Sequence, residues 1–461
     1  MPGLLYRNRL TIATKVGYDA PEMGETIGTQ RKRPTAKFAQ LAAVVVAAAV
    51  PLISVPGITS PFSTPKTALL AVWVVAAAVI VIARGLSEFR FESTLQKLAL
   101  AWLALASASA LWGQTASLEA LLIALLPPAS FLLLTWLKPS PASLVSALVA
   151  SGFAIACIAV AQYLGLDPFG WIGWQPAPAG GVRMKVYATL GNPNFVAAFL
   201  ACVLPLTWVL DGARLRNKIL AGFAALVMVL GIIVTGSRAP IVGAIALVLC
   251  AGWLFPSVSV RKRLLGLSLI VVFAALVAVL SAGRPMPEAL KGRLFIWQVT
   301  ITQVSARTLI LGDGPGSFAT SYPEWETQWA ISDARNQNSF RFMGYQEHAH
   351  NDWLEVLVEQ GIPGLVLLLL IPAGALRIFS TLTLEFDGPA AGAVAGIAIF
   401  GGLAWVDFPF HRPAECFVFW TLLAIVHLSF LTVSGVADST EEVTGEVLEE
   451  PVATPGRGGS V

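Results

Sequence analysis

The chain has 461 residues, of which 56% are hydrophobic and only 12% are charged, and its formal net charge is +3. Soluble domains carry about twice this charged fraction, so the composition excludes an ordinary soluble protein, a disordered chain and a nucleic-acid-binding protein. The four cysteines all lie in apolar runs, where they act as small hydrophobic side chains and predict neither a disulfide framework nor a metal site. The sequence therefore predicts an all-α polytopic membrane protein.

Twelve apolar runs are long enough to cross about 30 Å of hydrocarbon, for which a helix needs roughly 17–25 residues. Nine of them fall within residues 38–282, and three fall within residues 361–433. The third run is the shortest and is rich in alanine and serine. The approximate bounds are 38–55, 67–83, 98–112, 118–137, 143–164, 194–210, 218–235, 238–255, 264–282, 361–379, 390–407 and 414–433.

Lysine and arginine in the short loops predict the orientation, because cytoplasmic loops retain positive charge. With a cytoplasmic N-terminus, the inside loops hold eleven such residues and the short outside loops hold only Lys66, Arg238 and Arg412. Both termini are therefore expected in the cytoplasm. Residues 1–37 form a tail before the first span, and residues 434–461 form an acidic tail that is predicted to be disordered.

Two longer segments are predicted on the outer face. One covers residues 165–193, and the other covers residues 283–360, directly before the tenth span. The second segment is rich in aromatic residues and long enough for a small extramembrane domain. Because the spans carry few polar side chains, the function is expected where polar residues gather at the outer ends of the spans.

The first such group is Thr235-Gly-Ser-Arg238, in the tight turn between the seventh and eighth spans. An arginine presents a permanent charge on a planar group with several donors, which suits it to a phosphate or pyrophosphate. An arginine at this position also commonly extends to lipid headgroups, and the residue pattern alone does not separate the two roles.

The second group combines Arg293 and Trp297 with the run Gly312-Asp-Gly-Pro-Gly. The glycine run lacks the following Lys-Ser/Thr of a nucleotide-binding loop, so it predicts a tight turn that shapes the outer segment. Arg293 begins a stretch with the pattern of an amphipathic helix. It is a candidate for a second anion ligand or for a surface charge.

The third group is Glu347-His348-Ala-His350-Asn351, followed by acidic residues. Histidine titrates near neutral pH and is a natural proton acceptor for a hydroxyl nucleophile. A zinc site is one alternative, although the zinc-protease pattern on a helix has its histidines four residues apart rather than two. Another alternative is a polar cap on the helix that enters the tenth span.

Together, these groups resemble the O-antigen ligase and polymerase family of bacterial envelope enzymes. The resemblance covers roughly residues 185–365 and includes the order of the motifs, the number of spans and the large outer loop. It rests on six short stretches, namely Gly191-Asn-Pro-Asn194, Thr235-Gly-Ser-Arg238, Arg293 to Trp297, Gly312 to Phe318, His348 to Leu354 and Gly361-x-x-Gly364.

The resemblance implies a GT-C-like membrane glycosyltransferase of the bacterial inner membrane, active on the periplasmic face without metal or cofactor. Such an enzyme moves a glycan from undecaprenyl pyrophosphate to an acceptor hydroxyl, with inversion. Arg238 and Arg293 would hold the pyrophosphate, and His350, which directly precedes Asn351, would activate the acceptor. The remaining substrate-binding candidates are Asn351, His348, Asn194 and Trp297.

The acceptor would be lipid A core for a ligase, or a second lipid-linked glycan for a polymerase, and the residues do not distinguish these. A secondary transporter or lipid flippase is the alternative from another class, because twelve spans are common there. A transporter is expected to show an inverted repeat and membrane-buried carboxylates. Here the acidic residues, such as Asp211 and Asp387, lie at span ends or in loops.

Overall fold

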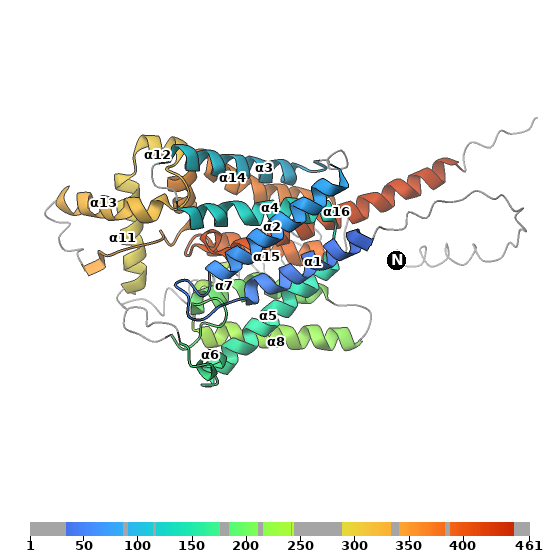
Figure 1. Cartoon of the computed structure of the whole chain (residues 1–461), viewed down its shortest axis with the longest axis horizontal. Helices are drawn as coiled ribbons and strands as arrows, with labels where there is room; N and C mark the ends of the chain where they lie inside the picture. Colours follow the sequence, from blue (N-terminus) through green and yellow to red (C-terminus); the bar gives the residue numbers. More distant parts are fainter. Residues whose placement is uncertain are drawn as a thin grey trace, which may run out of the picture. The chain divides into compact units, whose positions relative to one another are not determined.

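The computed structural model describes residues 34–85, 91–113, 117–175, 184–210, 215–240, 242–243, 288–332, 341–382 and 388–446. Within these ranges every element of regular structure is helical, which confirms the predicted all-α class for the described part of the chain (Figure 1). The expected eighth span and ninth span, at 238–255 and 264–282, lie almost wholly outside the described residues.

Seven described helices are long and apolar enough to cross a membrane. They are α2 (Thr64–Arg84), α3 (Thr94–Trp112), α4 (Leu118–Leu137), α5 (Pro141–Tyr163), α8 (Leu215–Thr235), α14 (Asp352–Thr381) and α16 (Pro413–Glu446). Three shorter apolar helices are α1 (Pro34–Leu52), α7 (Pro193–Val203), which continues as the 3-10 turn η2 (Leu204–Val209), and α15 (Pro389–Leu403). The protein is thus a polytopic membrane protein, and the count of twelve spans stays a prediction.

Small residues allow these helices to approach closely, as is typical of helix packing in membranes. Gly396 of α15 faces the backbone carbonyl of Cys202 in α7, and Gly231 of α8 faces Ala156 of α5, so a larger side chain at either glycine would collide. Helix α16 lies at the centre of this packing, with residues 412–429 buried throughout. Its first turn carries Glu415, which is buried as well.

The aromatic-rich segment before α14 forms a second, smaller core. It contains α11 (Glu288–Gln303), α12 (Ala306–Leu311) and α13 (Ser317–Ser332), which lie together in Figure 1. Phe295 meets Trp329 edge to face at 5.2 Å between ring centroids, and Phe318 stacks on Tyr322 at 5.3 Å. Such aromatic pairs add to the stabilisation that burial provides. This core also includes Ala349, so it fixes the segment that carries the two histidines.

The Gly312-Asp-Gly-Pro-Gly run fastens this segment to α14. The backbone N–H of Asp313 donates to the carbonyl of Val358 at 3.0 Å, and that of Gly314 donates to the carbonyl of Glu359 at 2.8 Å. Gly312 has a φ of +73°, and a side chain there would collide with the Glu359 backbone. The run is therefore a structural turn, as its sequence predicts, and it holds the first turns of α14 in place.

Candidate active site

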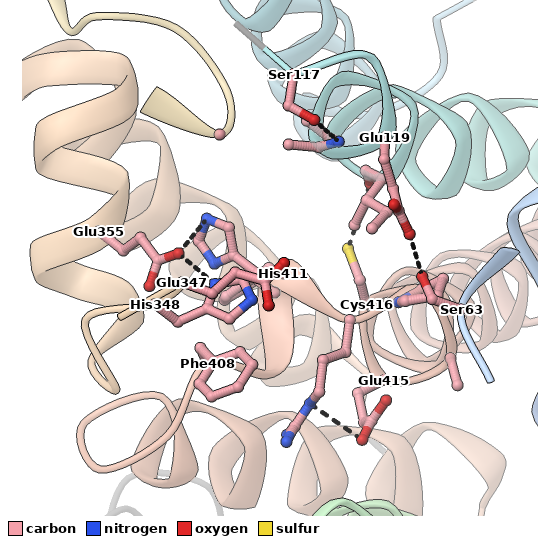
Figure 2. A pocket seen from close by; sticks show the side chains of 18 of the residues that line it. Ser63, Ser117, Glu119, Glu347, His348, Glu355, Phe408, His411, Glu415 and Cys416 are labelled. Atoms are coloured by element: carbon pink, nitrogen blue, oxygen red, sulfur yellow. Dashed lines mark hydrogen bonds and ion pairs between the residues drawn. The ribbon is translucent and has the colours of Figure 1, made fainter. Parts of the chain in front are cut away.

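A cavity of about 350 Å³ lies where the N-terminal turns of α2, α4, α7, α14 and α16 meet (Figure 2). Three of these helices carry acidic residues in the first turn, namely Glu119 in α4, Asp352 and Glu355 in α14, and Glu415 in α16. Negative side chains are favourable at helix N-termini, where the unpaired backbone N–H groups present partial positive charge. The convergence of helix ends therefore explains how so many carboxylates are held close together.

His348 is oriented by a buried carboxylate at the wall of this cavity. Its Nδ1 lies 2.7 Å from Oε1 of Glu355, and the other oxygen of Glu355 accepts the backbone N–H of Ala349 at 2.8 Å. The imidazole stacks on Phe408 at 4.0 Å between centroids (Figure 2). Because Nδ1 is engaged and the ring is fixed by stacking, Nε2 is the ring nitrogen that remains for a ligand.

His411 is the centre of a buried ionic network. Its Nδ1 lies 2.6 Å from Oδ1 of Asp352, and its Nε2 lies 3.1 Å from Oε2 of Glu359 and 3.6 Å from Oε1 of Glu355. Burial by itself would lower the pKa of His411. The negative charges of Glu355 and Glu359 have the larger effect and raise this pKa well above its ordinary value. His411 is therefore an imidazolium at neutral pH.

Two cations that the sequence places in outside loops are buried beside the cavity. Arg412 is 5% exposed, lies 3.2 Å from Asp407 and 3.2 Å from Glu415, and stacks over Phe195 at 3.8 Å. Lys66 is 1% exposed and donates to two backbone carbonyls at 2.6 and 2.7 Å. Neither residue extends to lipid headgroups.

His350 has different surroundings from His348 and His411. Its backbone adopts the left-handed region at φ 52°, which is unusual for a residue other than glycine and is often found at functional sites. Burial lowers the pKa of His350 to about 4, and the positive charge of Arg293 contributes to this. The ring, which meets Phe408 edge-on at 5.1 Å, is therefore neutral at physiological pH.

Helix α11 brings the predicted Arg293 and Trp297 to the same segment. The indole N–H of Trp297 donates to the carbonyl of Ala349 at 2.8 Å, and Arg293 lies one turn earlier on α11. Asn351 is the N-cap of α14, with its side-chain oxygen accepting the backbone N–H of Leu354 at 3.0 Å. The sequence interpretation of this group as a helix cap is confirmed for Asn351.

Arg238 and Asn194 have no described contact with the histidines. Arg238 is exposed after the end of α8, and Gly243, just beyond it, packs on Ile399 near the C-terminal end of α15. The carbonyl of Ala404, which follows α15, accepts the backbone N–H of Asp352, so this end of α15 adjoins the site. Asn194 lies in the first turn of α7, directly before Phe195 of the cavity wall.

One group could hold a metal ion. Glu355, Glu359 and His411 present ligand atoms that lie within 4.8 Å of one another. A histidine that bonds a carboxylate through its other ring nitrogen is a common metal ligand, and His411 makes such a bond to Asp352. To bind a metal ion, the imidazole of His411 would have to be neutral, and its Nε2, which lies 3.1 Å from Oε2 of Glu359, would have to face the ion.

Residues 223–369 match the family described as O-antigen ligase. This segment is similar to the O-antigen ligase family. The match confirms the resemblance seen in the motifs, and it indicates an O-antigen ligase- or polymerase-like membrane enzyme of surface polysaccharide biosynthesis. No curated protein matches the chain.

The family segment contributes only part of the site. It includes Arg238, Arg293 and both His348 and His350, whereas the opposite cavity wall comes from other parts of the chain. The sequence reasoning missed this wall, including Lys66, Phe408, His411, Arg412 and Glu415. A usable signal existed for Lys66 and Arg412, because positive charge in a short outside loop runs against the usual bias of membrane proteins.

Proposed function

We propose that the protein is a glycosyltransferase of the O-antigen ligase type. It transfers a glycan from undecaprenyl pyrophosphate to an acceptor hydroxyl on the outer face of the bacterial inner membrane, with both termini in the cytoplasm. The observation that carries the proposal is a neutral histidine, His350, held in strained backbone beside Arg293 and next to a polar cavity. A neutral base next to a permanent cation suits a reaction that removes a proton and expels a diphosphate.

In the proposed step, His350 accepts the proton of the acceptor hydroxyl while the hydroxyl oxygen attacks the anomeric carbon of the donor sugar. The bond between that carbon and the pyrophosphate oxygen breaks, and undecaprenyl pyrophosphate leaves with the bonding electrons. Attack from the side opposite the leaving group inverts the anomeric carbon. General-base help of this kind contributes about 10²–10⁴-fold to a rate.

Arg293 and Arg238 are the proposed ligands of the leaving pyrophosphate. Two guanidinium groups stabilise negative charge that grows in the transition state, and they do so without a metal ion. The hydrogen bond of Trp297 to Ala349 fixes α11 against the histidine segment, which supports this role for Arg293. Arg238 lies on the exposed turn after α8.

The acceptor is proposed to be lipid A core. If the acceptor were instead a second lipid-linked glycan, the enzyme would be a polymerase.

The test is transfer in purified membranes that are supplied with undecaprenyl-pyrophosphate glycan and lipid A core, with and without EDTA. We expect glycan on the core in both conditions for the wild type, and none for His350→Ala. Longer lipid-linked glycan chains, with no glycan on the lipid A core, would identify a polymerase.

A matched control is His427→Leu, which removes a histidine from the membrane part of α16, where both ring nitrogens are buried without a hydrogen bond. This variant should transfer glycan like the wild type. Loss of transfer on chelation would overturn the metal-independent step. No product of either kind from folded wild type with intact donor would overturn the glycosyltransferase proposal and favour a transporter.

A further inference from the structure

The charge of the cavity wall restricts what the cavity can bind. Five carboxylates line it, those of Glu119, Glu347, Glu355, Glu359 and Glu415. Three basic side chains line it, those of Lys66, His411 and Arg412. Each of these side chains already contacts carboxylates or backbone carbonyls of the protein. A phosphate or carboxylate in the cavity would therefore meet more negative charge than positive charge, and its binding would be unfavourable.

Two residues of the cavity wall also carry buried polar atoms that have no hydrogen-bond partner. Gln360 is 2% exposed and its Oε1, an acceptor, is unpaired, while Nη2 of the 5% exposed Arg412, a donor, is unpaired as well. Buried polar atoms without partners are costly, so such atoms indicate a missing ligand or water. A hydroxyl group can donate to Gln360 and accept from Arg412, whereas a purely anionic group can only accept.

Aromatic rings form the remaining wall. Phe62, Trp102, Phe195, Phe408 and Phe410 all line the cavity. Sites for small molecules typically combine such apolar faces with a few convergent polar groups, and the volume of about 350 Å³ lies in their usual range. The flat faces suit the C–H groups of a sugar ring, while the polar atoms suit its hydroxyl groups.

Phe408 separates this cavity from the proposed leaving-group side. His348 stacks on the face of Phe408 and lines the cavity, while His350 meets the same ring edge-on and, like Arg293, is not part of the cavity wall. The cations proposed for the pyrophosphate and the carboxylates of the cavity thus lie in different surroundings. The site has an electropositive part for an anion and an electronegative part for a neutral or hydroxyl-rich group.

We infer that this cavity is the acceptor subsite and that it takes a neutral, hydroxyl-bearing sugar, in preference to a phosphorylated or carboxylated one. The inference rests on the proposed glycosyl transfer for the identity of its ligand as the acceptor. Gln360 and Arg412 bind sugar hydroxyls, and His348, held by Glu355, directs the reacting hydroxyl past Phe408 to His350. Specificity for the acceptor is therefore set partly by charge exclusion.

The binding test uses saturation-transfer NMR on the full chain in lipid nanodiscs. The probes are glucose, galactose, N-acetylglucosamine and a heptose, each with its phosphorylated counterpart. We expect transfer of saturation to at least one neutral sugar and a weaker signal from its phosphate. Equal or stronger signals from the phosphates, or no signal from either class, would overturn the inference.

Charge reversal at the exposed Glu347 tests the electrostatic part without disturbing the buried core. Glu347→Lys should lower the ratio of the neutral-sugar signal to the sugar-phosphate signal by several-fold. The matched control is Glu324→Lys, an exposed glutamate of α13 outside the cavity wall, which should leave the preference unchanged. Equal effects of the two substitutions would mean that only the overall charge of the protein matters.

A kinetic test separates this inference from the proposed function. Gln360→Leu should raise the acceptor KM about 10-fold, the effect of one lost hydrogen bond, and leave the donor KM unchanged. A rise in the donor KM alone would overturn the acceptor subsite while the glycosyltransferase stands. If the wild type transfers nothing, the proposed function fails, and the NMR experiment still decides whether the cavity binds sugars.

Discussion

His350 and His411 are two partly buried histidines that both lie close to Phe408 or its neighbours, and their surroundings push their protonation in opposite directions. Burial and the charge of Arg293 lower the pKa of His350 to about 4, so the ring is neutral. Glu355 and Glu359 overcome the same burial penalty at His411 and raise its pKa well above the ordinary value. Opposed environments of this kind are how one site obtains a base and a fixed cation at a single pH.

The contrast teaches that burial alone does not assign a role to a histidine. His411 has charged partners on both ring nitrogens, so it stabilises the contact between α14 and the turn before α16. His350 has an unpaired Nδ1 and a strained backbone, so the protein gains little stability from it. Four predictions test this division of roles.

The largest expected effect is on catalysis at His350. His350→Gln should lower the transfer rate by about 10²–10⁴-fold, because the general base is removed, with little change in melting temperature. Initial rates and thermal melting of the purified protein check both parts. A variant that unfolds at a lower temperature but keeps its rate would reverse the assignment of roles.

The next effect is on stability at His411. His411→Gln leaves the buried carboxylates of Asp352 and Glu359 without their cation, which should cost about 3–5 kcal/mol of unfolding free energy. Because the folded pKa is raised, this stabilisation is fully present below the ordinary pKa of about 6.5 and is lost as pH rises through the folded value. Melting curves of wild type and variant should therefore converge at alkaline pH. A difference in melting temperature between wild type and variant that grows as pH rises would contradict a charged His411.

A smaller effect is expected in the pH dependence of transfer. Since the pKa of His350 is lowered to about 4, its protonation should not slow the wild type between pH 7 and 5. Arg293→Gln removes a charge that favours the neutral ring, so the acid limb of the normalised rate profile should move to higher pH. Arg307→Gln, an exposed arginine of α12 paired with Asp313, is the control and should leave the limb in place. If the acid limb of the Arg293→Gln profile stays at the wild-type pH, the charge of Arg293 does not lower the pKa of His350.

The smallest effect is at the cap of α14. Asn351→Ala removes the acceptor for the N–H of Leu354 and should lower the unfolding free energy by about 1 kcal/mol, measured by thermal melting. Asn351→Ser keeps a capping oxygen and should restore most of the loss. If alanine abolishes transfer while stability holds, Asn351 contacts substrate and its role exceeds that of a cap.

Sequence reasoning singled out residues on one side of the candidate site and missed those on the other side, and the roles of the predicted residues stay a prediction. Arg293, Trp297, His348 and His350 stand in ordered motifs, and α11, which carries the first two, packs against the segment that carries the two histidines. The partners of His411 are Asp352 and Glu359, which lie 59 and 52 residues away along the chain. Nothing in the local pattern of the turn before α16 specifies such a pairing.

The sequence by itself determined the membrane helices, the glycine turn at 312–316 and the cap at Asn351, because each depends on neighbours within a few residues. A long apolar run must form a helix in hydrocarbon, where each backbone polar group needs an internal partner. Only the tertiary structure decided that Lys66 and Arg412 are buried, because Lys66 donates to the carbonyl of Thr189 and Arg412 stacks over Phe195, both from distant parts of the chain. It also decided that helix N-termini from distant parts of the chain meet around one cavity, where their partial charges stabilise carboxylates that no single helix would gather.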